Sequence, residues 1–233
     1  MVTSEPTVSG ERPRPYSEEL WEAITPTYKA ILDHPFIRGL VDGTLPRAAF
    51  RHFVVQDSHY LRDYARALAV CAARAPDEDD VRAFASDAVG AIAAEQEMHA
   101  AFMADLGGSA GQAADLPVGP ATRAYTSYLL ATVYGGSFLD GLAAVLPCYW
   151  IYARVGEALL AESSPDPLYR RWIAAYGDEA FQSVVRRVVS VADRAGAEAT
   201  GGQRARALEH FVTTARYEWM FWDAAWRQET WPV

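Results

Sequence analysis

Cysteine is scarce in this sequence, which has only Cys71 and Cys148 among 233 residues. Two cysteines cannot build the disulfide framework of a small secreted domain, and their spacing does not match a metal-binding pair. A reducing compartment therefore suits the chain. The first residues, MVTSEPTVSGERPRPYS, have no apolar core of a secretory signal, so we expect a cytoplasmic protein.

An excess of basic residues and a long apolar run are also missing. The formal net charge is -9, whereas a nucleic-acid-binding surface needs clustered lysine and arginine. No run of about 18 apolar residues is present, so no membrane-spanning helix is expected. The aromatic content of 12% is fairly high, which suits both a packed core and a pocket for a flat ligand.

The alternation of apolar and polar residues that marks β-strands is rare, and helical spacing dominates. Helices are expected to begin near Ser17, Pro46, the acidic run at 75–80, Pro120, Ser137, Pro167, Asp178 and residue 203. Ser17 is the expected N-cap of the first helix, which runs towards His34. Ser137 with Asp140 is expected to form a capping box at the start of a later helix. The sequence therefore predicts one all-α domain, a helical bundle over residues 16–233, after a disordered tail over residues 1–15.

The stretch VLPCYWIY (145–152) places a proline and a cysteine side by side in an apolar helix. Pro147 is expected to bend that helix, because it removes a backbone N–H. Cys148 and Tyr152 are four residues apart and therefore share a face. Free cysteine is often simply buried in a core, but a thiol beside a base or a positive charge can act as a nucleophile. The stretch alone leaves both interpretations open.

An acidic residue lies between aromatic residues in VVQDSHYLRDYAR. Asp57 shares one helix face with Phe53 and Tyr60. A lone carboxylate on such a face is unfavourable because it loses its hydration. Asp57 is therefore expected either to bond a neighbouring helix or to serve a functional site.

A second acidic residue of this kind occurs in ARYEWMFWDAAW, where Glu218 precedes Phe221 by about one turn. Burial raises the pKa of a carboxyl and lets it act as both acid and base near neutral pH. The alternative is a solvated side chain, or an ion pair with Arg216 or Arg227. The pattern does not decide between these roles.

The segment AEQEMH places Glu95 and His99 four residues apart, a spacing that two metal ligands can use. A di-iron bundle needs Glu-x-x-His on two helices, and the sequence has no such tetrad. The pair is therefore interpreted as structural, with a metal oxidase kept as an alternative.

Seven blocks in order along the chain resemble one family: HPF, DGTLP, QDSHYL, YTSY, LPCYWIYARVGEAL, YRRWIAAYGDEAF and YEWMFWDAAW. The resemblance is to the TenA-type thiaminase II family of aminopyrimidine aminohydrolases, and it covers about residues 17–228. It implies a haem-oxygenase-like fold without haem, a homotetramer, and no metal or organic cofactor. It also implies hydrolysis of 4-amino-5-aminomethyl-2-methylpyrimidine, and less efficiently of thiamine, to the hydroxymethylpyrimidine used in thiamine salvage.

The resemblance also implies roles for eight residues. Cys148 matches the nucleophile, Asp57 the acid that binds the ring nitrogen and amino group, and Glu218 the acid/base near the leaving amine. Residues that match the pocket around the ring are Tyr60, Tyr125, Tyr152, Tyr176 and Phe221. A non-catalytic pyrimidine-binding or regulatory protein of the same fold is the alternative function.

Overall fold

The structure, a computed structural model, describes residues 14–108 and 116–233, apart from the side chains of residues 94–96. The described residues form helices and no strand, which confirms the predicted all-α class. The helices are α1 (Tyr16–Leu32), α2 (Pro35–Asp42), α3 (Arg47–Arg74), α4 (Glu78–Ala94), the π-helical turn η1 (Glu95–His99), α5 (Ala100–Asp105), α7 (Pro120–Gly135), α8 (Phe138–Leu160), α9 (Pro167–Gly177), α10 (Glu179–Glu198) and α11 (Gly201–Arg227). None of the helices described here is long and apolar enough to cross a membrane.

Residues 1–13 of the predicted tail lie outside the described residues. The remaining two tail residues adjoin α1: Pro15 precedes its first turn, and Arg14 forms ion pairs with Glu18 and Glu22 on it.

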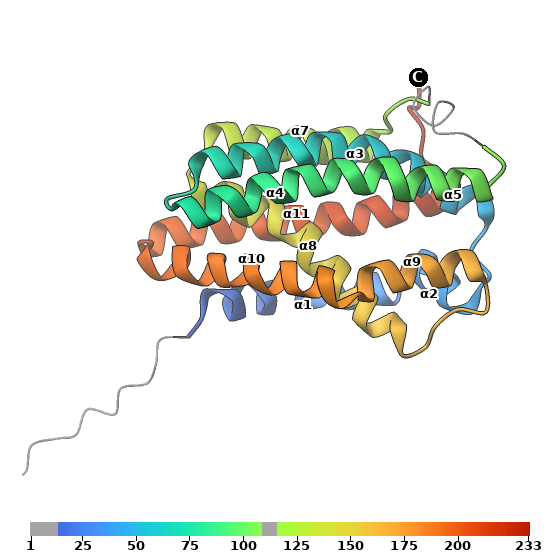
Figure 1. The fold of residues 1–233 in the computed structure, drawn as a ribbon, viewed down its shortest axis with the longest axis horizontal. Coiled ribbons are helices and arrows are strands. Elements are labelled where there is room, and N and C mark those ends of the chain that lie inside the picture. Colours follow the sequence, from blue (N-terminus) through green and yellow to red (C-terminus); the bar gives the residue numbers. More distant parts are fainter. Residues whose placement is uncertain (1–13, 109–115) are drawn as a thin grey trace, which may run out of the picture.

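Helix α8 lies at the centre of the bundle. In Figure 1, α3, α4 and α7 occupy one side, α1, α9 and α10 the other, and α8 and α11 lie between them. Accordingly, α8 packs against α3, α7, α9, α10 and α11. It is apolar on nearly every side and most of its residues are buried, as expected of a helix surrounded by others. A side chain on α8 can therefore meet residues from most of the bundle.

Local capping explains most helix starts. The Ser137 side chain accepts a hydrogen bond from the Asp140 N–H, and the Asp140 side chain accepts one from the Ser137 N–H, so the predicted capping box is present. Pro120 and Pro167 occupy the first helical positions of α7 and α9. Asp178 accepts a hydrogen bond from the Ala180 N–H and caps α10.

The first helix begins and ends within two residues of its predicted limits, but Ser17 is not its N-cap. Ser17 is buried inside α1, and both its N–H and its hydroxyl donate to the Asp193 carboxylate on α10, 2.7 and 3.0 Å away. At the other end α1 stops at Leu32, and His34 is extended because Pro35 follows it. His34 instead caps α2, accepting a hydrogen bond from the Phe36 N–H at 3.1 Å.

Candidate active site

Three helices that are far apart in the sequence bring a thiol and two carboxyl groups together. Asp57 comes from α3, Cys148 from α8 and Glu218 from α11. Asp57 and Glu218 are only 3% and 2% exposed. Helix α8 remains helical on both sides of Pro147. Cys148 lies close enough to the two carboxyl groups that their charges affect the pKa of the Cys148 thiol.

A cavity of about 470 Å³ adjoins these groups. Four of the eight predicted site residues line it: Asp57, Cys148, Tyr152 and Tyr176. Cys148 is partly exposed because it faces this space, although it lies deep in the protein. The other four predicted residues do not line the cavity but contact one another next to Cys148: Tyr60, Tyr125, Glu218 and Phe221.

Aromatic rings surround the thiol and the carboxyl groups. The Tyr152 and Tyr176 rings lie 4.8 Å apart, centre to centre, at the cavity wall. The Tyr60 ring lies 4.9 Å from that of Tyr125 and 5.8 Å from that of Phe221. The Tyr60 hydroxyl is buried and has no hydrogen-bond partner among the described residues. The structure thus brings together all the residues to which the sequence assigns a site role.

Glu218 is held in an unusual protonation state by its surroundings. The pKa of its carboxyl is raised from 4.5 to about 8, mainly by burial and to a smaller extent by the nearby Asp57 charge. The Tyr125 hydroxyl donates a hydrogen bond to Oε1 of Glu218 at 2.7 Å, which opposes that rise in pKa. At neutral pH Glu218 therefore carries a proton that it can donate.

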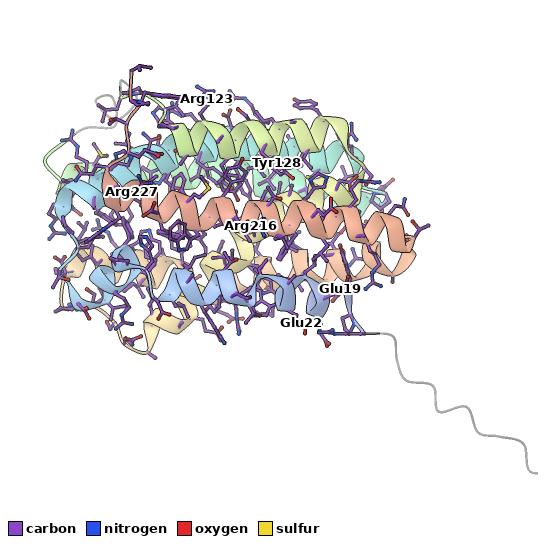
Figure 2. The ribbon with its side chains drawn as sticks, turned by 180° about the vertical axis from the view of Figure 1, so that it is seen from behind. Glu19, Glu22, Arg123, Tyr128, Arg216 and Arg227 are labelled. Carbon is purple, nitrogen blue, oxygen red and sulfur yellow. The ribbon has the colours of Figure 1, made fainter. Side chains whose placement is uncertain are left out.

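The alternative in which Glu218 pairs with an arginine is wrong. Arg216 and Arg227 are exposed on α11, and both are labelled in Figure 2, which views the molecule from the side opposite to Figure 1. Arg227 pairs with Asp223 and Glu229. Because Glu218 is on the buried face of the helix, an exposed arginine on the same helix does not reach it.

The Cys148 thiol is also protonated near neutral pH. Burial raises the pKa of the thiol well above 9.0, and the charges of Glu218 and Asp57 add to this effect. The nearby hydroxyls of Tyr60 and Tyr64 act in the opposite direction and lower the pKa of the thiol. Cys71, by contrast, is buried on α3 and does not line this cavity, and burial raises the pKa of its thiol to about 12.

Asp57 has a partner that the sequence did not indicate. Nε2 of His99 lies 2.8 Å from Oδ2 of Asp57, so the imidazole N–H donates to the carboxylate. Both side chains are buried, and Nδ1 of His99 has no hydrogen-bond partner among the described residues. His99 ends η1, a π-helical turn of the kind often found at functional sites. The pair fixes the orientation of Asp57 at the cavity wall.

This contact refines the interpretation of the AEQEMH segment. His99 bonds Asp57, a cavity residue on another helix, and Asp57 thereby has the bond to a neighbouring helix that was one of its two expected roles. The Glu95 side chain lies outside the described residues. Over residues 14–108 and 116–233, no group of three or more described side chains is arranged to hold a metal ion.

The bundle and its cavity define a haem-oxygenase-like helical protein. A domain of unknown function from Shewanella denitrificans OS217, described as having a heme oxygenase-like fold, matches with a TM-score of 0.71 at 16% identity, over 91% of this chain and 92% of that one. At this identity the likeness bears on the fold alone.

Sequence comparison identifies the family within that fold. The chain belongs to the TENA/THI-4/PQQC family, which matches residues 21–228, as the sequence blocks predict. It is 37% identical over 216 residues to the aminopyrimidine aminohydrolase of Bacillus subtilis (strain 168), covering 93% of this chain and 92% of the relative. A TenA homologue from P. horikoshii OT3 matches with a TM-score of 0.85 at 29% identity, over 92% and 99% of the two chains.

Proposed function

We propose that this protein is an aminopyrimidine aminohydrolase of the thiaminase II type. It is a hydrolase of C–N bonds, and its substrate is 4-amino-5-aminomethyl-2-methylpyrimidine, with thiamine a poorer one. The observation that carries the proposal is the meeting of Asp57, Cys148 and Glu218 beside one aromatic cavity. The relatedness to the Bacillus subtilis enzyme supports it.

The cavity suits a flat, electron-poor ring. Tyr152 and Tyr176, whose rings contact each other, together offer aromatic surface to one face of it. Asp57, with Oδ2 held by His99, presents a carboxyl group to the ring nitrogen and its neighbouring amino group. A proton shared with that nitrogen makes the ring a better electrophile, and this prepares it for attack by Cys148.

Addition of the thiol opens the reaction. The Cys148 sulfur bonds to a ring carbon and releases its proton, while the ring nitrogen beside Asp57 takes up a proton. The addition therefore creates no net charge, which suits a thiol whose pKa is raised by burial. The electron pair gained by the ring then breaks the bond between the exocyclic methylene and the amine nitrogen.

Glu218 moves protons in both halves of the reaction. With a pKa of about 8 it is protonated at neutral pH and gives its proton to the leaving amine. Water then adds to the methylene carbon and returns a proton to Glu218. The C–S bond breaks, and Cys148 regains its proton from the ring nitrogen. The net change converts an aminomethyl group and water into a hydroxymethyl group and ammonia.

The test is turnover of the aminomethylpyrimidine by purified protein, followed by mass spectrometry of the hydroxymethyl product. We expect Cys148→Ala to lose at least about a hundredfold in kcat, whereas Cys71→Ala, the matched control for a thiol outside the cavity, keeps the rate. Ligand binding by folded wild-type protein without turnover would instead support the non-catalytic binding protein. Full activity of Cys148→Ala would remove the nucleophile assignment alone.

We also propose that the protein is a homotetramer, which rests on the family resemblance. Light scattering of the purified chain gives the mass directly, and a monomer or dimer would contradict this.

A further inference from the structure

The cavity is larger than the pyrimidine ring needs. A six-membered ring fills a cavity of about 150 Å³, whereas this one measures about 470 Å³. Its lining changes from buried to exposed along its depth. The floor consists of Asp57, Cys148 and Tyr152, and the mouth of Ser86, Gly90 and Ala175, which are all exposed. A ring held at the floor therefore directs its substituents towards the mouth.

Gly90 occupies one side of this mouth, on α4. Among the described residues, a Cβ built at Gly90 would meet no atom within 4 Å apart from its two chain neighbours and the helix's own backbone. Because Gly90 also lines the cavity, a side chain at this position would occupy the passage. Phe181 and Val184 on α10 belong to the same lining. Helices α4 and α10 both lie on the near side of the molecule in Figure 1, with α8 farther back.

A polar cluster that includes the cavity-lining residues Asp87 and Tyr149 connects the helices around the mouth. Asp87, one turn before Gly90, accepts hydrogen bonds from Arg187 on α10 at 2.7 Å to each carboxylate oxygen. The Tyr149 hydroxyl on α8 donates to Oδ2 of Asp87 at 2.7 Å. These contacts tie α4 to α8 and α10, so α4 does not move aside freely when a side chain is added at residue 90.

We propose that Gly90 sets the size of the leaving group that the site accepts. This inference rests on the proposed function, because that function places the pyrimidine at the floor. An ammonia leaving group stays beside Cys148 and never reaches Gly90. A leaving group that carries its own ring extends into the mouth and depends on the space that the missing side chain provides.

The experiment compares two substrates in wild-type protein and in Gly90→Leu. Thiamine carries a ring leaving group, and the aminomethylpyrimidine releases ammonia. We expect the ratio of kcat/KM for thiamine to that for the aminomethylpyrimidine to fall about tenfold or more in Gly90→Leu. Gly90→Ala should give a smaller change in the same direction. Leucine favours helix more than glycine does, so the variant is expected to fold.

Ala85→Leu is the matched control, because it adds a side chain to an exposed position of α4 that does not line the cavity. The substrate ratio should stay within about twofold of wild type in this variant, which leaves the substrate contacts intact. An unchanged ratio in Gly90→Leu, or an equal loss with both substrates, would overturn the role of Gly90 while leaving the proposed function standing. Failure of wild-type protein to hydrolyse either substrate would overturn both.

Discussion

Replacing Glu218 with glutamine should make the protein more stable at high pH. The amide has nearly the shape of a protonated carboxyl group, and its oxygen can still accept the hydrogen bond that the Tyr125 hydroxyl gives to Oε1. It cannot ionise. The comparison of wild type with Glu218→Gln therefore isolates the free energy of placing a charge in the buried position of Glu218.

The size and sign of this effect follow from the pKa of Glu218, which is 4.5 in an unfolded chain and about 8 in the fold. Below pH 4.5 the carboxyl is protonated in both states and contributes nothing. Between pH 4.5 and 8 only the unfolded state releases the proton, so stability falls as pH rises. Above pH 8 the full difference, on the order of 5 kcal/mol, destabilises the wild-type fold.

Urea unfolding of both proteins between pH 5 and pH 9 measures the effect. The free energy of unfolding of the variant, relative to that of wild type, should increase by about 4 kcal/mol from pH 5 to pH 9. Glu209→Gln is the control, since Glu209 is an exposed carboxyl on the same helix. The difference in unfolding free energy between this control and wild type should stay nearly constant over the same pH range. A constant difference for Glu218→Gln as well would show that burial does not hold the proton on Glu218, and the acid role would lose its basis.

Two further substitutions test how the site is supported. His99→Leu removes the donor to buried Asp57, so we expect the unfolding free energy to fall by about 1–3 kcal/mol and the KM for the aminomethylpyrimidine to rise. His99→Gln should partly restore both values. An unchanged KM in His99→Leu would contradict a role in orienting Asp57. Gly156→Ala would drive its Cβ into the Tyr176 backbone carbonyl, which should destabilise the fold by about 1–3 kcal/mol and lower kcat/KM by moving Tyr176. Thermal unfolding and steady-state kinetics check this, and wild-type values for both would refute the close contact between α8 and α9.

Helix starts could be predicted where the signal is local. Ser137 and Asp140 are three residues apart, so the capping box is visible in the sequence and present in the fold. Ser17 looks like an equally good cap, but its partner is Asp193, on a helix near the other end of the chain. A side chain that bonds a distant helix is indistinguishable by spacing from one that caps its own.

The candidate site also combines contacts that local spacing predicts with contacts between distant helices that it does not predict. Cys148 and Tyr152 were predicted to share a helix face, and both line the cavity. Asp57 and Glu218 lie near Cys148 and Tyr152 because of packing between helices. Residue spacing does not encode this packing, and only the family resemblance suggested it. The His99–Asp57 pair joins residues 42 positions apart through a π-helical turn. The four-residue interval between Glu95 and His99 suggested a metal ligand and gave no sign of that contact.

Helix α8 contributes Cys148, Tyr149 and Tyr152 to the lining of the cavity. Cys148 and Tyr152 face the cavity, and Gly156 lies against the backbone of Tyr176. Inserting or deleting one residue between Cys148 and Tyr152 would rotate everything beyond it by about 100° around the helix axis. The thiol and its aromatic wall would then point in different directions. Length changes during the evolution of this chain are therefore expected in its loops, while the spacing along α8 stays fixed.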